Sequence, residues 1–133
     1  MSLSVEERQA LVKLEMEKAM KTYAEAEALM KGEFWNGVAS RLYYAVFHAV
    51  SALLVHDKHQ VNTHRGAHTM FALHYIRTNA LPTQYGKLFN QLQTMREESD
   101  CNCIYDVDPE ELAAKMQPAK QLILDIGEMI QKQ

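Results

Sequence analysis

An arginine and a histidine share one face of an otherwise apolar segment. As a helix, Trp35–His56 is apolar on nearly every side, and only a narrow polar stripe interrupts it. The polar stripe consists of Arg41, Tyr44, His48 and Ser51, spaced i, i+3, i+7 and i+10, so its members fall on one helical face. A buried charge is costly unless it meets a partner, a ligand or another subunit. The polar stripe is therefore our first candidate site.

The residue types in the polar stripe suit cleavage of RNA without a metal ion. An arginine holds phosphate oxygens in fork geometry, and a histidine accepts or donates a proton near neutral pH. Together they would deprotonate a 2′-hydroxyl and hold the charge that develops on the phosphorane, and a two-fold dimer would bring two copies together. The structural alternative is that Arg41 pairs with an acid such as Glu27 or Asp100, and that His48 is a satisfied interface histidine.

A second group of candidates lies in and after the polar segment Asp57–Gly66. His64 and His68 are spaced i, i+4, which is compatible with a metal ion bound on a helix. No carboxylate or cysteine completes a recognised ligand spacing, so we expect no metal site and no cofactor. Cys101 and Cys103 do not form a Cys-x-x-Cys pair and are expected to be free thiols in a loop.

Helical periodicity predicts five helices that would position these residues. The first is expected to run from an N-cap at Ser4 to about Lys31, and the second is Trp35–His56. The others are expected at about Gly66–Thr78, Gln84–Glu97 and Pro109–Ile130, with an irregular acidic loop over Ser99–Asp108. Because no strand pattern is present, we predict an all-α, up-and-down helical bundle that forms one domain over residues 1–133.

Composition limits the class of protein. The 133 residues are 47% hydrophobic and 23% charged, with a formal net charge of −3 and no block of lysine or arginine. This profile fits a helical globular protein and argues against nucleic-acid binding by the whole surface, but it allows a local basic pocket. No stretch combines the length and apolar purity of a transmembrane span, and no signal-peptide pattern is present. We therefore expect a soluble, cytoplasmic protein with no membrane partner.

Several motifs together resemble those of small prokaryotic HEPN-domain proteins, named for the nucleotide-binding domain of higher eukaryotes and prokaryotes. The most specific is the block from Arg41 to His48, which reads Arg-x-Tyr-Tyr-Ala-x-Phe-His. Gly32-Glu33-Phe34 precedes this block. Thr63-His64-Arg65-Gly66, Arg96-Glu97-Glu98-Ser99-Asp100 and a closing helix with Ala119 follow it in the expected order. The resemblance spans nearly the whole chain.

The resemblance implies an antiparallel helical bundle that dimerises through its central helical face. Many such proteins are encoded beside a minimal nucleotidyltransferase, in toxin–antitoxin or related systems. Members with an Arg-x4-6-His motif are metal-independent RNases, a pattern that Arg41 and His48 satisfy, and others bind nucleotides or partner proteins. Two positions depart from the nuclease pattern: Leu42 follows the arginine where a polar residue is usual, and the segment at Arg96 has no nearby histidine and carries Cys101 in place of the usual tyrosine.

These observations leave three functional hypotheses. In the first, a homodimer serves as the nucleotide- or RNA-phosphate-binding module of a HEPN/nucleotidyltransferase pair, and its ligand cleft near the dimer interface is lined by Arg41, Tyr44, His48, Arg96 and Asp100. In the second, the protein is a metal-independent endoribonuclease with His48 as general acid/base, Arg41 as phosphate clamp and Tyr44 as an orienting donor. In the third, it is a helical dimer whose polar stripe forms interface ion pairs only.

Overall fold

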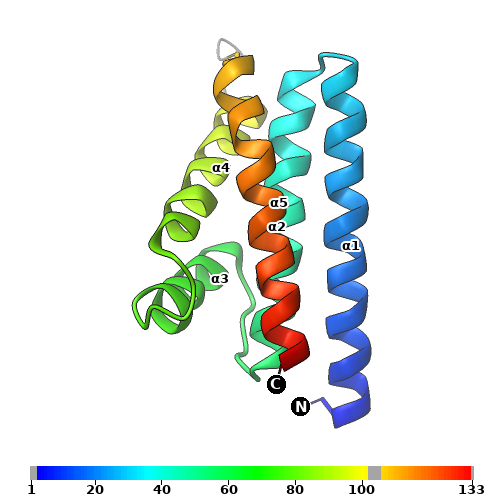
Figure 1. The fold of residues 1–133 in the computed structure, drawn as a ribbon, viewed down its shortest axis with the longest axis vertical. Coiled ribbons are helices and arrows are strands. Elements are labelled where there is room, and N and C mark those ends of the chain that lie inside the picture. The colour runs from blue at the N-terminus through cyan, green and yellow to red at the C-terminus, as the bar shows by residue number, and fades with distance from the viewer. Residues whose placement is uncertain (1–2, 102–105, 133) are drawn as a thin grey trace.

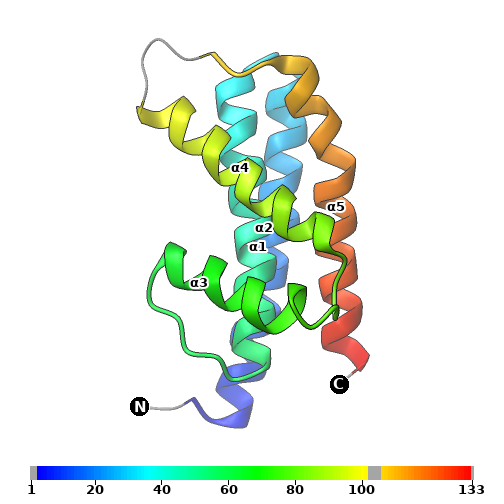
Figure 2. The same cartoon turned by 90° about the vertical axis from the view of Figure 1, so that its left-hand side faces the viewer.

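Three long helices run side by side, and two further helices lie across one side of them (Figure 1, Figure 2). The computed structural model describes residues 3–101 and 106–132. The long helices are α1 (Val5–Lys31), α2 (Trp35–His56) and α5 (Pro109–Lys132), and those that cross them are α3 (His64–Phe71) and α4 (Thr83–Cys101). A π-helical turn at Ala72–Ile76 continues α3. Because no strand occurs in the described ranges, the prediction of an all-α bundle is confirmed.

The central helix of the bundle is α2, which contacts each of the other α-helices. Eleven of its residues are buried: Val38, Ala39, Leu42, Tyr43, Ala45, Val46, Ala49, Val50, Ala52, Leu53 and Leu54. By length and apolar composition α2 would also suit a membrane span, so our expectation that no stretch would do so is wrong. Its most apolar window is nevertheless 61% buried inside the protein, and the neighbouring helices therefore account for its composition.

The predicted starts of the first and last helices are confirmed. At α1, the Glu7 amide donates to Ser4 Oγ over 3.1 Å and the Ser4 amide donates to Glu7 Oε1 over 2.8 Å, which forms a capping box. At α5, Pro109 occupies the first position and the Glu110 amide donates to Asp108 Oδ1 over 3.0 Å. These caps satisfy amide groups that the first turn of a helix leaves without an intrahelical partner.

The start of α3 agrees with our predictions, whereas the end of α4 differs from them. We expected Thr63 or His64 to open the third helix, and α3 does begin at His64, because the Thr63 hydroxyl oxygen accepts a hydrogen bond from the Gly66 amide over 2.9 Å and so acts as N-cap. α4 continues to Cys101, so the first part of the expected acidic loop is helical. Cys101 is exposed and free, as expected, whereas Cys103 lies outside the described residues.

The inward face of α4 follows the predicted helical spacing. Its buried residues are Tyr85, Leu88, Phe89, Leu92 and Met95, all of which we expected to face the core. They join one hydrophobic cluster with residues of α1, α2, α3 and α5. Packing of this face brings the polar side chains of Asn90 and Arg96 against the middle of α2 and the start of α3, as described next.

Candidate functional site

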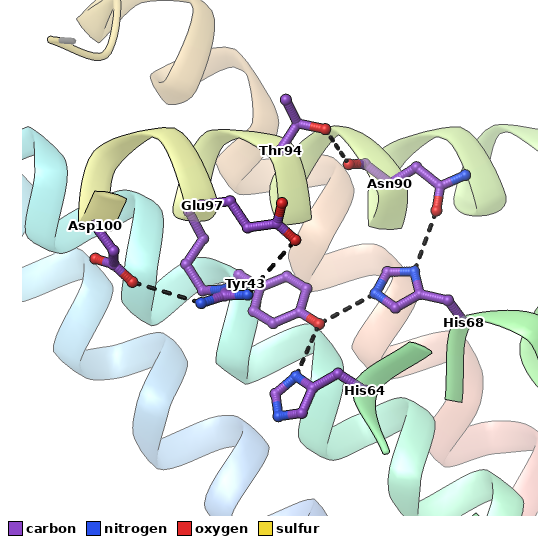
Figure 3. A network of polar contacts seen from close by, with 8 residues as sticks. Tyr43, His64, His68, Asn90, Thr94, Glu97 and Asp100 are labelled. Atoms are coloured by element: carbon purple, nitrogen blue, oxygen red, sulfur yellow. Dashed lines mark hydrogen bonds and ion pairs between the residues drawn. The ribbon is translucent and has the colours of Figure 1, made fainter. Parts of the chain in front are cut away.

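The hydroxyl of Tyr43 lies at the centre of a hydrogen-bond network between α2, α3 and α4. The Tyr43 side chain comes from α2 and is fully buried. Its oxygen lies 3.3 Å from His64 Nδ1 and 3.1 Å from His68 Nε2, both on α3, and His68 Nδ1 lies 3.1 Å from Asn90 Oδ1 on α4 (Figure 3). We call these four residues the tyrosine–histidine network. It joins three helices and runs from the buried Tyr43, through the half-buried histidines, to the exposed Asn90.

The first turn of α3 sets the direction of the two histidines. His64 and His68 are one helical turn apart, so both side chains project from the same face toward Tyr43. The Thr63 cap fixes where this turn begins. A Cβ atom at Gly66 would lie 3.0 Å from the capping Thr63 Oγ1, so glycine at this position leaves room for the cap.

Stacked aromatic rings hold both imidazoles in place. The His64 ring stacks on Phe47 with a centroid distance of 4.2 Å, and the His68 ring stacks on Phe89 at 3.7 Å. The Phe89 ring also contacts Tyr43, at 5.7 Å. Because each imidazole is fixed both by stacking and by hydrogen bonding, the network presents its nitrogen atoms at defined positions.

Arg96 of α4 places a positive charge beside the network. Its guanidinium carbon lies 5.0 Å from the centroid of the Tyr43 ring and 5.6 Å from that of Tyr44, and its side chain is only 18% exposed. It forms ion pairs with Asp100 at 3.5 Å and with Glu97 at 3.8 Å. The cation is therefore held against aromatic rings, where contacts of this kind stabilise it by about 0.5–2 kcal/mol.

Two polar atoms on this turn of α4 lack hydrogen-bond partners. Among the residues that the structure describes, Arg96 Nε and Ser99 Oγ are buried and make no hydrogen bond. A buried group of this kind costs about 1–3 kcal/mol relative to a satisfied one. Native proteins contain few such groups, and each calls for an explanation such as a functional role or a missing ligand. Within residues 3–101 and 106–132, the end of α4 is therefore where buried side-chain polar groups are least compensated.

Burial keeps the network uncharged at neutral pH. Burial raises the pKa of the Tyr43 hydroxyl to about 12, although the nearby Arg96 opposes this effect. Burial, followed by the nearby Arg96 and His48, lowers the pKa of His64, and burial is also the largest cause of the lowered pKa of His68. Tyr43 therefore keeps its proton and both histidines are neutral, so each imidazole has one nitrogen that donates and one that accepts.

The Arg41 end of the polar stripe lies outside the network. Arg41 is half exposed, and its Nε lies 3.7 Å from Oε1 of Glu25 on α1. The alternative that Arg41 pairs with an acid is confirmed, but the acid is Glu25 of α1 rather than Glu27 or Asp100, and Asp100 pairs instead with Arg96. An exposed pair at this distance contributes little to stability, so the Arg41 side chain is readily available to other anions.

His48 also pairs with α1, while Tyr44 joins the network side. His48 Nδ1 lies 2.9 Å from Oε1 of Glu15. Of the five residues predicted to bind a ligand, the structure thus groups Tyr44, Arg96 and Asp100 through Arg96. Arg41 contacts Glu25 and His48 contacts Glu15, so these two residues are not grouped with the others. Their role in ligand binding stays a prediction.

Sequence reasoning did not place Tyr43, His68 or Asn90 in the site. The i, i+4 spacing of His64 and His68 identified a pair that acts together, but as candidate metal ligands. In the structure one nitrogen of each ring faces the Tyr43 hydroxyl, and among the described residues no group of three or more His, Cys, Asp or Glu side chains is arranged to hold a metal ion. Tyr43 lies 21 and 25 positions from the two histidines, a separation at which local spacing carries no signal.

A cavity of about 410 Å³ opens beside His64, between α1, α2 and the segment that joins α2 to α3. Its polar lining includes Glu15, Ser51, Asn62 and His64, and the Phe47 ring that stacks on His64 also lines it. This volume lies within the range of about 300–1,000 Å³ that is common for small-molecule sites. The imidazole of His64 therefore connects the buried network with a space that a ligand can enter.

Comparison with known proteins places the chain in a family. The sequence model of the HEPN domain matches residues 12–131. The chain belongs to the HEPN family. The HEPN domain includes every residue of the tyrosine–histidine network, together with Arg96 and the polar stripe. In this domain Arg96 of α4 and His64 of α3 both contact Tyr43. The sequence near Arg96 contains no histidine, so packing of α3 and α4 brings these two residue types to the same tyrosine.

Relatives of this HEPN protein include two archaeal proteins and one bacterial protein. "Putative toxin MJ0142" of Methanocaldococcus jannaschii is 32% identical over 96 residues, which cover 72% of this chain and 65% of that protein. The "UPF0332 protein" of Thermotoga maritima is 23% identical over 125 residues, which cover 94% and 95%. "Putative toxin MJ0605" of Methanocaldococcus jannaschii is 27% identical over 95 residues, which cover 71% and 68%. The chain thus spans a little under two thirds of the first of these relatives.

Proposed function

We propose that this HEPN protein has a toxin-related role and binds the phosphodiester backbone of RNA beside the tyrosine–histidine network. The observation that carries the proposal is the position of Arg96. Its guanidinium is fixed against the rings of Tyr43 and Tyr44, and the imidazole of His64 contacts the same tyrosine. A fixed guanidinium favours phosphate oxygens because its planar fork matches their geometry.

The surroundings of Arg96 suit RNA better than an isolated phosphate ion. Unstacked bases of single-stranded RNA bind to aromatic and histidine rings. Arg96 lies beside the Tyr44 ring, which contacts His64 edge to face, and His64 in turn stacks on Phe47. Glu97 and Asp100 are about half exposed and lie 3.8 and 3.5 Å from the guanidinium. Because these carboxylates are solvated, a phosphodiester can compete with them for the guanidinium.

The toxin-related part of the proposal is supported by the names of two relatives. Arg41 and His48 would extend the binding surface along α2, with Tyr44 as the residue common to the polar stripe and the Arg96 contacts. A homodimer and a nucleotidyltransferase partner stay predictions of the family resemblance, as does the cytoplasmic location.

Binding of a short labelled single-stranded RNA, followed by fluorescence anisotropy, tests the proposal. Arg96→Ala should weaken binding about 10- to 100-fold, because a charge-assisted hydrogen bond contributes roughly 1.5–3 kcal/mol. The matched control is Arg77→Ala, since Arg77 is exposed and lies outside the site, and it should change affinity less than about twofold. If Arg96→Ala binds RNA as tightly as the wild type, the proposal fails.

A metal-independent endoribonuclease is the second candidate. The observation that favours it is the 2.9 Å contact between His48 Nδ1 and the Glu15 carboxylate, because a carboxylate at one nitrogen orients the imidazole for acid/base work at the other. This candidate predicts RNA cleavage in the presence of EDTA that His48→Ala abolishes without loss of folding. Cleavage that persists in His48→Ala would rule out His48 as the acid/base group.

A further inference from the structure

A cavity separate from the tyrosine–histidine network lies between the start of α1 and the end of α5, beside the last turn of α2. We propose that this α1–α5 cavity is a second binding site, which takes a small amphipathic anion: a medium-chain carboxylate with its charge on an apolar body. In Figure 1 the N- and C-terminal ends of the chain lie at this end of the bundle. The inference goes beyond the proposed function, because no residue that lines the α1–α5 cavity belongs to the network.

The charged side chains that line the α1–α5 cavity favour an anion. Arg8 and Lys13 come from α1 and Lys58 from the turn after α2, and the described residues that line the cavity include no aspartate or glutamate. In the parts of the chain that the structure describes, none of these three cations forms an ion pair. The carboxylate of Asp57 lies outside the lining and accepts a hydrogen bond from Tyr75. On a protein with a formal net charge of −3, this cavity is a local cationic site.

Backbone carbonyl groups hold Arg8 in place without neutralising its charge. Arg8 Nε donates to the Val55 carbonyl oxygen over 3.2 Å, and Nη1 donates to the Leu3 carbonyl oxygen over 3.4 Å. A guanidinium has more N–H donors than these two contacts use. A carboxylate that enters the cavity therefore meets a cation whose position is already fixed, which reduces the entropy lost on binding.

Lys58 occupies a backbone position at which glycine is usual. Its φ of 67° lies in the left-handed region. The Lys58 amide donates to the Val55 carbonyl over 3.1 Å and the His59 amide donates to the Leu54 carbonyl over 2.8 Å, the paired hydrogen bonds of a Schellman motif. A residue with a Cβ atom is strained there, and such strain is concentrated at functional sites. The positive charge that Lys58 brings to the cavity is something that glycine cannot provide.

Apolar side chains also line the α1–α5 cavity, and they suit the body of the ligand. Val12, Met16 and Ile130 contribute to the wall, and Val5 does so although it is 68% exposed. A Cβ atom at Gly127 of α5 would lie 3.5 Å from Met16 Cε, so glycine leaves space there. The volume of about 590 Å³ lies within the range of about 300–1,000 Å³ that is common for small-molecule sites. An apolar body in this space would remove the surface of Val5 from water.

A methyl NMR titration with three probes tests the proposal. Octanoate carries both the charge and the apolar body, 1-octanol carries the apolar body alone, and acetate carries the charge alone. The methyl signals of Val5, Val12, Met16 and Ile130 report on the cavity, and those of the buried Leu92 of α4 are the reference. Octanoate should shift the cavity signals with a Kd at least about 10-fold below that of 1-octanol, because a hydrogen bond to a charged group contributes about this factor. Acetate at the same concentration should leave them unchanged.

Two lysine variants test recognition of the charge. Lys58→Gly should raise the melting temperature, because glycine relieves the positive φ, and should nevertheless weaken octanoate binding about 3- to 10-fold. Lys13→Met should weaken octanoate binding by a similar factor and leave 1-octanol binding unchanged. The matched control is Lys18→Met, which removes an exposed lysine of the same helix that does not line the cavity, and it should change affinity less than about twofold.

A glycine variant tests the volume of the α1–α5 cavity. Gly127→Leu should fill the space in front of Met16 and abolish binding of both octanoate and 1-octanol. Gly127→Ala is its control, because the added methyl group makes ordinary van der Waals contact with Met16, and it should bind octanoate within about threefold of the wild type. Circular dichroism melting shows that both variants are folded.

Four outcomes overturn the inference. It is wrong if octanoate does not shift the cavity signals, or if octanoate binds no more tightly than 1-octanol. It is also wrong if Lys58→Gly and Lys13→Met both bind octanoate like the wild type. If the cavity signals change with protein concentration in the absence of any probe, a second copy of the chain covers the cavity instead. None of these outcomes bears on RNA binding at the network, which Arg96→Ala tests.

Discussion

The two sides of α2 organise their polar groups in different ways. On the side that faces α3 and α4, Tyr43 joins residues of both helices through shared hydrogen bonds and stacked rings. On the side that faces α1, Arg41 and His48 each contact a single glutamate, and neither pair is linked to the other by a hydrogen bond among the described residues. In a low-dielectric setting, loss of one member of a hydrogen-bonded network weakens the interactions of the others. Loss of one separate ion pair leaves the other pair unchanged.

This difference means that shared hydrogen bonds and stacked rings fix the polar groups on one side only. Groups that are buried and mutually bonded hold fixed positions, which is what binding and proton transfer require. The Arg41–Glu25 pair is about half exposed, so removal of either partner leaves a group that water can solvate, whereas the side chains of the His48–Glu15 pair are each 23% exposed. The following predictions test the contrast by changing one side at a time.

The largest stability effect is expected at Phe89. Phe89 is 1% exposed and contacts His68, Phe71 and Tyr43. Phe89→Ala should lower the free energy of unfolding by about 3–5 kcal/mol, because it removes buried surface and leaves a cavity. Urea denaturation measures the change. Phe34→Ala is the control, since Phe34 is 64% exposed and its loss should cost under about 0.5 kcal/mol; equal losses would contradict the packing described here.

A smaller effect is expected when only the central hydroxyl is removed. Tyr43→Phe keeps the ring but leaves His64 Nδ1 and His68 Nε2 without their shared partner. The free energy of unfolding should fall by about 1–3 kcal/mol, the cost of buried polar groups that lose a hydrogen bond. In Tyr44→Phe the loss should be near zero, because the Tyr44 hydroxyl makes no hydrogen bond among the described residues. If Tyr43→Phe leaves the free energy of unfolding unchanged, the network does not stabilise the fold.

Stability should fall as the solution is acidified below the ordinary histidine pKa. His59, His64 and His68 all have a pKa lowered from 6.5, with burial as the largest cause, so the unfolded chain binds protons that the folded chain does not. The stabilisation is complete above pH 6.5 and is lost progressively below it, by at most about 1.4 kcal/mol per pH unit for each histidine. Thermal melts from pH 7.5 to pH 5 measure the slope, and His68→Asn should reduce it. An unchanged slope would contradict burial as the cause.

The smallest effect is expected on the α1 side. Glu25→Gln removes the charge that faces Arg41, a pair whose side chains are 46% and 50% exposed. The free energy of unfolding should change by less than about 0.5 kcal/mol, since exposed ion pairs are solvated and screened by salt. Urea midpoints of the variant and the wild type, measured at low and at high salt, provide the comparison. A loss above about 2 kcal/mol would show that the two sides of α2 are not different in kind.

Sequence reasoning succeeded where local patterns determine the structure. The bounds of α2, the caps of α1 and α5, and the inward face of α4 follow from helical spacing and capping chemistry. It was less accurate at the end of α4. There Arg96 and Asp100 form an i, i+4 ion pair within the helix, and the acidic composition had suggested a loop.

The candidate site was predicted only in part, because its residues meet across long sequence separations. The Arg-x6-His pattern directed attention to Arg41 and His48, which share a helix but not a contact. Tyr44 and Arg96, which we expected to line one ligand cleft, lie against each other, while the cleft and its ligand stay predictions. The hydrogen bond between Tyr43 and His64 depends on how α3 packs across α2, and residue spacing along the chain does not predict that packing.

The central claim is that RNA binds at the tyrosine–histidine network. Its most direct test is an NMR titration in which the imidazole signals of all histidines are followed while a short 2′-O-methyl RNA is added. We expect the His64 signals to shift most, those of His68 to follow, and those of His74, which lies outside the tyrosine–histidine network, not to move. A titration in which RNA binds and the His64 and His68 signals stay unchanged would contradict it.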